Sequence, residues 1–250
     1  MTLLSLKNVS KRFLDGAREV LVLDRVCLEI DAGDLVGIYG ERRSGKSILM
    51  EIAAGLQVPD EGTVSFAGQD MTGLSISRRA RFRRRHGIAL AGGDWRPSVE
   101  IGRPVMEQVA LPLTNDGLTL AESEAVARPV LERFSVMQWA HVSIDRLSVS
   151  ERIRVGLARA VAREPRMLLV DEPAVLSGRS ESRELYALLR SLASDDGMAV
   201  AIASEDVTAL DGVQRFMTID DGRLRSTDSH REVLQFPQRR SQGGNGPLAS

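Results

Sequence analysis

The stretch that decides the fold is GERRSGKSI, residues 40–48, which fits the pattern G-x-x-x-x-G-K-[ST]. In this pattern, backbone N–H groups surround phosphate oxygens, the lysine reaches the terminal phosphates and the hydroxyl ligates Mg²⁺. Lys46 is one of only three lysines among 33 basic residues, and a compact ammonium fits between loop and phosphates where a forked guanidinium would not. The predicted nucleotide-binding residues are Gly40, Glu41, Arg42, Arg43, Ser44, Gly45, Lys46, Ser47 and Ile48.

The residues around this loop support the same interpretation. LVGIY, residues 35–39, is typical of a short buried strand, and SILMEIAAGL, residues 47–56, has the apolar spacing of a buried helix. A helix that begins at the loop adds its partial positive charge to a phosphate site. The alternative, a glycine-rich turn with an incidental lysine, is disfavoured once a second motif is counted.

The second motif is MLLVDEP, residues 167–173, four apolar residues that end in two carboxylates. A carboxylate at the end of a buried strand can hold the Mg²⁺ shell, and its neighbour can orient or deprotonate the attacking water. We therefore predict Ser47 and Asp171 as Mg²⁺ ligands and Glu172 as the candidate general base. Taken alone, the acidic pair is equally compatible with a surface turn after any strand.

The composition sets limits on other functions. The chain has 250 residues, a net charge of -1 and a single cysteine, Cys27. The net charge would not attract the chain as a whole to nucleic acid, and one cysteine cannot form an internal disulfide. No apolar run approaches the roughly 20 residues of a membrane-spanning helix, and the first residues do not resemble a secretory signal. We expect a cytoplasmic protein whose membrane role comes through a partner.

Strand and helix patterns alternate along the chain. Strands are predicted over 3–13, 18–30, 35–39, 63–68, 167–171 and 198–204, helices over 47–56 and 181–194, a mainly helical region over 76–165, and an Asp-Gly hairpin over 215–226. Apolar strands that alternate with helices predict an α/β fold with a parallel sheet covered on both faces. Residues 237–250 are polar and glycine-rich, as in a disordered tail.

A resemblance extends from LLSLKNVSKRF (3–13) to DDGRL (220–224), and it is carried most clearly by RRARFRRRHGIAL (78–90), VMEQVALPL (105–113) and DRLSVSERIRVGLARAVAREPRMLLVDEP (145–173). The chain resembles the nucleotide-binding domain of ABC transporters, in particular the lipoprotein-release, macrolide-export and cell-division branch. The resemblance implies a P-loop NTPase core with an antiparallel β subdomain and an inserted helical subdomain, about 76–165, within a domain over 1–236. It also implies ATP and Mg²⁺ as cofactors, a membrane permease, and a second nucleotide-binding chain, identical or not.

The largest departure from the family pattern lies at its signature, usually L-S-G-G-Q, which binds the ATP held by the other chain. The aligned residues here are Leu147, Ser148, Val149, Ser150 and Glu151. Ser148 can still donate a hydrogen bond and Ser150 is a suitable helix cap. Val149, however, places a branched side chain where the backbone must approach a phosphate closely, and Glu151 adds a negative charge that repels the phosphate. We expect an ordinary capped helix rather than a phosphate-binding loop.

Other positions of the family pattern differ as well. Ala91 stands where a glutamine would sense Mg²⁺, Ser204 stands where a histidine would contact the γ-phosphate, and residues 174–180 lack the interface aspartate. Phe13 is aligned to stack on adenine, although it could equally cover the core. Loss of one donor to a transition state costs about 10²- to 10³-fold in rate, so we expect slow or absent hydrolysis with ATP binding retained.

The run RRARFRRRH, residues 78–86, could indicate RNA, DNA or anionic lipid. Phe82 is its only interleaved aromatic residue, so a solvated helix face is favoured and no nucleic-acid partner is predicted. Two alternatives to the main hypothesis stay open. One is a working ATPase activated by its partners through Glu172, and the other is a soluble, nucleotide-gated regulatory module without a transporter.

Overall fold

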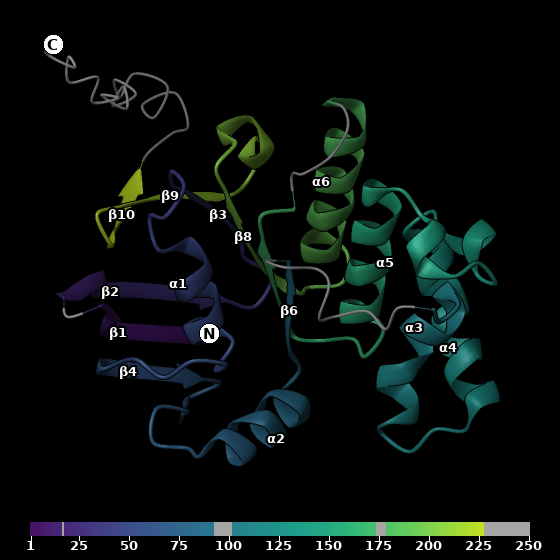
Figure 1. The fold of residues 1–250 in the computed structure, drawn as a ribbon, viewed down its shortest axis with the longest axis horizontal. Coiled ribbons are helices and arrows are strands. Elements are labelled where there is room, and N and C mark those ends of the chain that lie inside the picture. Colours follow the sequence, from purple (N-terminus) through teal and green to yellow (C-terminus); the bar gives the residue numbers. More distant parts are fainter. Residues whose placement is uncertain (17, 93–101, 174–178, 228–250) are drawn as a thin grey trace, which may run out of the picture.

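The computed structural model describes residues 1–16, 18–92, 102–173 and 179–227. Its central element is a six-stranded sheet in the order β10-β9-β3-β8-β7-β6, in which the four neighbouring pairs from β9 to β6 are parallel and β9–β10 is antiparallel (Figure 1). These strands are β3 Leu35–Tyr39, β6 Ile88–Gly92, β7 Met167–Asp171, β8 Ala199–Ser204, β9 Arg215–Asp220 and β10 Arg223–Thr227. The predicted parallel sheet is confirmed.

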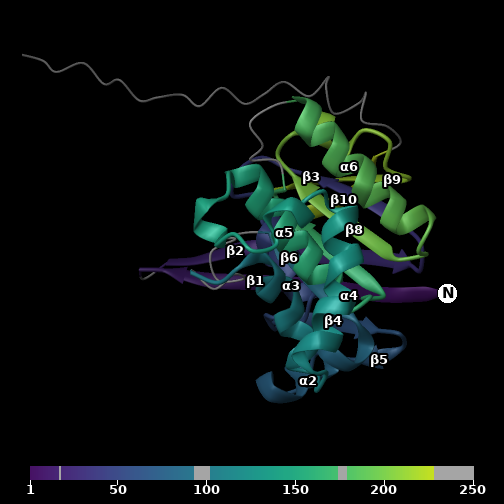
Figure 2. The same ribbon diagram turned by 90° about the vertical axis from the view of Figure 1, so that its right-hand side faces the viewer.

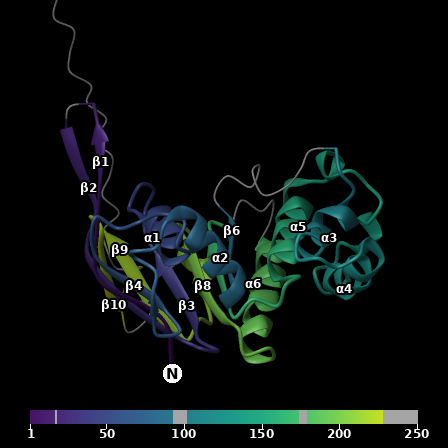
Figure 3. The ribbon, with the colours of Figure 1, turned by 90° about the horizontal axis from the view of Figure 1, so that it is seen from below.

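A second, antiparallel sheet has the order β2-β1-β4-β5. It consists of β1 Thr2–Asp15, β2 Arg18–Asp31, β4 Glu61–Phe66 and β5 Gln69–Asp70. Figure 3 shows the β1–β2 hairpin reaching beyond the rest of the sheet. This sheet is the antiparallel β subdomain that the resemblance implies.

The helices flank the central sheet, with α3, α4 and α5 together on one side (Figures 1 and 2). The α-helices are α1 Lys46–Ala53, α2 Ile76–His86, α3 Val105–Thr114, α4 Leu120–Arg133, α5 Val149–Val161 and α6 Arg179–Ser194, and the short 3-10 turns are η2 Met137–Trp139, η3 Ile144–Arg146 and η4 Val207–Leu210. The α4 helix continues through Pro129 without a break.

Two apolar cores lie on opposite faces of the central sheet because side chains along a strand alternate. In β7, Leu168 and Val170 join the core formed with α3–α6, whereas Met167 and Leu169 join the core formed with α1 and the antiparallel sheet. The four apolar residues of β7 therefore pack into both cores, and Asp171, which is also buried, ends the strand.

The segment predicted as helical over 76–165 falls into two parts. Strand β6 pairs with β7, and α2 packs toward the antiparallel sheet, where the Phe66 and His86 rings lie 6.4 Å apart. The helices from α3 to α5 form the compact helical region. The predicted tail, residues 237–250, lies outside the described residues.

Candidate functional site

The loop between β3 and α1 depends on two glycines that have no room for a side chain. A Cβ on Gly40 would lie 2.4 Å from Ser44 Oγ and 2.8 Å from the Ile219 carbonyl oxygen. Gly45 has a φ of 102° and a Cβ there would lie 2.9 Å from the Val22 carbonyl oxygen. The motif's glycines are therefore required by close backbone approach and by the left-handed conformation.

Lys46 is the first residue of α1, and its side chain reaches back to the loop. The residue is 5% exposed. Its Nζ donates to the carbonyl oxygens of Gly40 at 2.8 Å and Glu41 at 3.0 Å. The same ammonium forms an ion pair with Glu172 Oε1 at 3.0 Å. The structure thus brings together the lysine of the first motif and the second carboxylate of the other motif, although they are far apart in sequence.

Asp171 ends β7 and is 4% exposed. Its Oδ1 is buried and accepts no hydrogen bond within the described part of the chain. Burial raises the pKa of Asp171, while a hydrogen bond from the Ser47 hydroxyl acts in the opposite direction. A desolvated carboxylate with an unused oxygen beside a hydroxyl is a pair of hard ligands suited to a divalent cation.

Glu172 is held in place by backbone contacts as well as by Lys46. Its N–H donates to the Ala203 carbonyl at 3.0 Å and its Oε2 accepts from the Glu205 N–H at 3.2 Å. Its φ of 47° is in the left-handed region, which is costly for a residue with a side chain. The carboxylate is therefore fixed at the edge of the sheet, next to the phosphate loop.

The turn after β8 links the loop to Glu172. Ser204 is fully buried, its carbonyl accepts from the Gly40 N–H at 3.3 Å, and its Oγ accepts from the Asp206 N–H at 3.0 Å. The buried hydroxyl of Tyr186, from α6, lies near Ser204, and burial raises the pKa of this hydroxyl. Ser204 thus lies beside the predicted phosphate loop, and its hydroxyl is engaged in shaping the turn.

Ala91 lies at the end of β6, in register with Val170. Its side chain is 4% exposed and packs in the core with the helices. The next residue, Gly92, pairs with Asp171, and a Cβ on it would lie 1.9 Å from the Asp171 carbonyl oxygen. The position is beside the predicted Mg²⁺ ligand, but the methyl group offers no polar atom.

The aligned signature segment begins α5 with a complete capping box. The Ser148 hydroxyl accepts from the Glu151 N–H at 3.3 Å, and the Glu151 carboxylate accepts from the Ser148 N–H at 2.8 Å. The N-cap is therefore Ser148, and the expectation that Ser150 caps the helix is wrong because Ser150 already lies inside the first turn and is buried. Val149 is 43% exposed at the helix start.

The remaining predicted residues lie around the loop or apart from it. Arg43 is exposed with a φ of 65°, a strained conformation for a residue with a side chain, and Arg42 Nε lies 3.8 Å from Glu205 Oε2. Ile48 packs against the core beneath the antiparallel sheet. Phe13 is 38% exposed on β1, with Lys11 Nζ 5.4 Å from its ring centroid. Residues 174–178 of the predicted interface loop lie outside the described residues.

Besides the Lys46–Glu172 ion pair, two further features of the site were not predicted from the sequence: the hydrogen bond from the Glu205 N–H to Glu172 and the position of the Tyr186 hydroxyl near Ser204. Backbone donors carry no residue signature, so the first had no sequence signal. Tyr186 lies in the helix pattern predicted over 181–194 and reads there as an ordinary core residue. By contrast, Ser148-x-x-Glu151 is a capping-box pattern that could have identified the true N-cap.

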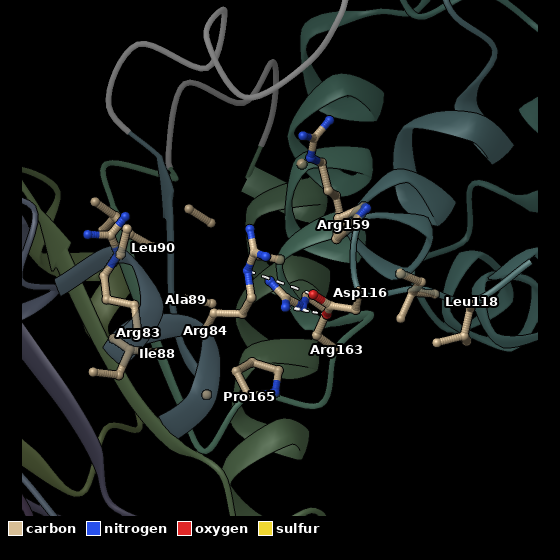
Figure 4. A pocket seen from close by; sticks show the side chains of 17 residues that line it. Arg83, Arg84, Ile88, Ala89, Leu90, Asp116, Leu118, Arg159, Arg163 and Pro165 are labelled. Atoms are coloured by element: carbon tan, nitrogen blue, oxygen red, sulfur yellow. Dashed lines mark ion pairs between the residues drawn. The ribbon is translucent and has the colours of Figure 1, made fainter. Parts of the chain in front are cut away.

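A separate cleft of about 520 Å³ lies between β6 with α2 and the helices α3 and α5 (Figure 4). Asp116 pairs there with Arg163, and its Oδ1 lies 3.7 Å from Arg84 Nε. These pairs join α2 to the helical region. The cleft contains none of the predicted phosphate-binding residues.

Three features together define a P-loop nucleoside triphosphate-binding protein. They are a loop whose glycines have no room for side chains, a buried lysine that bonds to this loop, and a carboxylate at a strand end with an oxygen that accepts no hydrogen bond from the described residues. Residues 23–175 match the family model for the ABC transporter. The chain belongs to the ABC transporter family and is an ATP-binding cassette.

Curated relatives give the same result. The chain is 33% identical to the lipoprotein-releasing system ATP-binding protein LolD of Shewanella denitrificans over 92% of this chain and 97% of that protein. It is 30% identical to the macrolide export ATP-binding/permease protein MacB 2 of Aeromonas hydrophila over 94% of this chain, which spans only 36% of that protein. The chain thus resembles the branch expected from its sequence.

Among solved structures, the ATP-binding cassette MJ0796 in a dimeric post-hydrolysis state bound to ADP and Pi superposes with a TM-score of 0.84. The identity is 26%, over 90% of this chain and 98% of that one. The fold predicted from the sequence is confirmed. Across the described residues, none of the helices has both the length and the apolar character needed to cross a bilayer.

Proposed function

We propose that this chain is the Mg-ATP-binding subunit of an ABC transport complex whose own site hydrolyses ATP slowly or not at all. The observation that carries the proposal is the buried Lys46, held at the loop's centre by Gly40, Glu41 and Glu172. Phosphate oxygens would replace these oxygens as its partners, and the loop N–H groups would surround the same phosphates. Lys46 and the loop supply binding without requiring hydrolysis.

The residues present fit Mg²⁺. Asp171 has a buried oxygen without a hydrogen bond, and the Ser47 hydroxyl lies against it. With phosphate and water oxygens these two would complete an oxygen shell, in which the ion supplies charge neutralisation for the phosphates. Glu172 would hold or accept the proton of the attacking water, once its bond to Lys46 is exchanged for phosphate.

Four positions support weak hydrolysis. Ala91 offers no polar atom beside Asp171, Ser204 uses its hydroxyl to fix a turn, and Val149 and Glu151 replace small or neutral residues of the family signature. Because the contributions of residues within one site are not additive, we propose that the rate of ATP hydrolysis is reduced, but we do not add up the losses at the four positions.

We propose 1–236 as the extent of the ATP-binding domain and 76–165 as that of its helical subdomain.

The relatives support the partners of this proposal. MJ0796 forms a dimer, and MacB 2 joins an ATP-binding part to a permease in one protein. We propose that this chain pairs with a second nucleotide-binding chain, identical or not, and docks on permease subunits. It would then be cytoplasmic and peripheral to the inner face of the cell membrane, with Phe13 beside the adenine.

The test is titration with a fluorescent ATP analogue and Mg²⁺, together with hydrolysis rates. We expect binding that Lys46→Ala abolishes, and the same trace hydrolysis before and after Glu172→Gln. Binding that ignores the Lys46 substitution would remove the basis of the proposal. Fast hydrolysis by the isolated homodimer, lost in Glu172→Gln, would contradict the weak-hydrolysis part.

A second candidate function is a working ATPase that partners activate. It is favoured by Glu172, which is present and oriented by the Glu205 N–H. Reconstitution with the permease separates the two, because turnover that appears only with partners and is lost in Glu172→Gln identifies this candidate. A regulatory module without a transporter would instead fail to co-purify with any membrane protein.

A further inference from the structure

The α2 helix carries a basic face that the nucleotide site does not use. Its sequence, ISRRARFRRRH, contains no acidic residue. Four of its arginines are exposed, and their spacing of three or four residues places them on one side of the helix. The basic face consists of Arg78, Arg81, Arg84 and Arg85.

This face is poorly neutralised by the protein itself. Arg84 Nε lies 3.7 Å from Asp116 Oδ1. Within the part of the chain that the structure describes, Arg78, Arg81 and Arg85 form no ion pair with a carboxylate. Like charges at this spacing destabilise a helix, and the whole chain has a net charge of only -1. The concentration of charge is therefore local, and an anionic partner would stabilise it.

The opposite side of α2 is fixed to the protein. Arg79 is buried and donates to the Leu74 carbonyl at 2.8 Å, and Arg83 donates to the Gly55 carbonyl at 3.2 Å. The Phe82 ring stacks on His86 with centroids 4.1 Å apart. Single-stranded nucleic acids bind on aromatic platforms beside basic residues, but the aromatic ring here is engaged on the inner side.

The basic face lies on the outside of the molecule. All four of its arginines are exposed, and Figure 1 places α2 at the lower edge, below β6 and the antiparallel sheet. Clusters of basic side chains on a helix are typical of binding to an anionic membrane surface. Ile76 is also exposed at the first position of α2, but at 3.6 residues per turn it lies on another side of the helix from Arg78, Arg81 and Arg85.

We propose that the basic face of α2 binds the anionic lipid surface of a bilayer directly. This goes beyond the proposed function, because it needs neither a permease nor nucleotide. An 11-residue helix with four arginines provides a reversible contact rather than an anchor. Each basic residue near such a surface strengthens binding about fivefold.

The experiment is co-sedimentation of the full chain with vesicles of phosphatidylcholine alone or with phosphatidylglycerol added. The test variant is Arg78→Gln, Arg81→Gln, Arg85→Gln. The matched control is Arg128→Gln, Arg183→Gln, Arg225→Gln, three exposed arginines on other elements without ion pairs to the described residues. Both variants change the net charge from -1 by -3 to -4, so they differ only in where the charge is removed.

We expect salt-sensitive binding to anionic vesicles only, weakened about a hundredfold in the test variant and little changed in the control. Equal loss in both triple variants, or equal binding to neutral vesicles, would overturn the proposal. So would wild-type binding to an oligonucleotide but not to vesicles. ATP-analogue binding measured on the same samples tests the proposed function separately, and unchanged melting shows that the variants fold.

Discussion

At the scale of single residues, the ion pair between Lys46 and Glu172 connects binding and catalysis. The ammonium that phosphate needs already bonds the candidate base, at 3.0 Å and with the lysine side chain only 6% exposed. In the proposed site, nucleotide would compete with Glu172 for Lys46. Such competition would give Glu172 an effect on affinity that is separate from any role in hydrolysis.

Glu172→Gln should tighten binding of the ATP analogue, because a neutral amide releases Lys46 to the phosphates. Loss of a partly exposed pair corresponds to about 1 kcal/mol, or roughly a fivefold lower Kd. Fluorescence titration measures it. The control is Glu205→Gln, which removes a nearby charge but keeps the N–H that Glu172 accepts. Unchanged affinity, or equal tightening in both variants, would show that the pair does not compete with nucleotide.

Asp171→Asn should make the protein more stable while weakening Mg-dependent binding. Burial raises the pKa of Asp171, so the ionised carboxylate costs folding free energy at pH values above that raised pKa. Near neutral pH we expect a melting temperature higher by about 2–4 °C. The gain should shrink as pH falls through the raised pKa toward the ordinary value of about 3.9.

The control for this prediction is Asp15→Asn at an exposed position whose carboxylate forms no hydrogen bond or ion pair with the described residues. It should leave both melting and nucleotide binding unchanged. Calorimetry over a pH series, with and without Mg²⁺ and ATP, gives both readouts. If the melting temperature of Asp171→Asn is lower than that of the wild type at every pH, the Asp171 carboxylate stabilises the fold without a bound cation, and the prediction is wrong.

At the scale of elements, the start of α5 is closed by a stable helix cap. Ser148 and Glu151 form a reciprocal capping box, and such a cap contributes about 1 kcal/mol. Val149 occupies the first helical position and is 43% exposed. If this segment approaches the phosphate of a second chain's nucleotide, as the proposed function requires, helix stability and phosphate approach make opposite demands on the same three residues.

The double variant Val149→Gly, Glu151→Gln should lower the melting temperature yet promote ATP-dependent dimerisation. Glycine costs about 1 kcal/mol in a helix, and glutamine removes the charge that opposes phosphate. The control is Leu120→Gly, Glu122→Gln, which makes the same changes at the matching positions of the α4 capping box. Sedimentation velocity with Mg-ATP measures dimers. Dimers in neither variant, or in both, would contradict a specific role for α5.

At the scale of the whole molecule, the sequence predicts most elements but not how distant ones meet. The loop, β7 and the sheet follow from periodicity and from motifs that carry their own geometry. The Lys46–Glu172 pair could not be predicted, because it depends on the long-range pairing that places β8 between β3 and β7. The position of α2 beside the antiparallel sheet has the same cause: only long-range pairing of β6 with β7 fixes it.

A mixing experiment tests the two-chain site that the proposed function requires. If each ATP lies between the loop of one chain and the α5 start of the other, the defects at Ser204 and at Val149 act on the same nucleotide from different chains. One variant would carry Ser204→His, the other Val149→Gly and Glu151→Gln. Either alone forms only sites that keep one defect, whereas a mixture also forms a site repaired on both sides.

We therefore expect the mixture to hydrolyse ATP at least about tenfold faster than either variant alone, since each restored donor contributes about 10²-fold or more and only some dimers are mixed. Phosphate release at a series of mixing ratios should peak near equal amounts. Adding Glu172→Gln to the Ser204→His chain should abolish the gain. In the repaired site this chain supplies the phosphate loop and the candidate base Glu172, whereas the other chain supplies the start of α5. A rate that is the simple average of the two variants at every ratio would show that Ser204 and the α5 start do not share a nucleotide across chains.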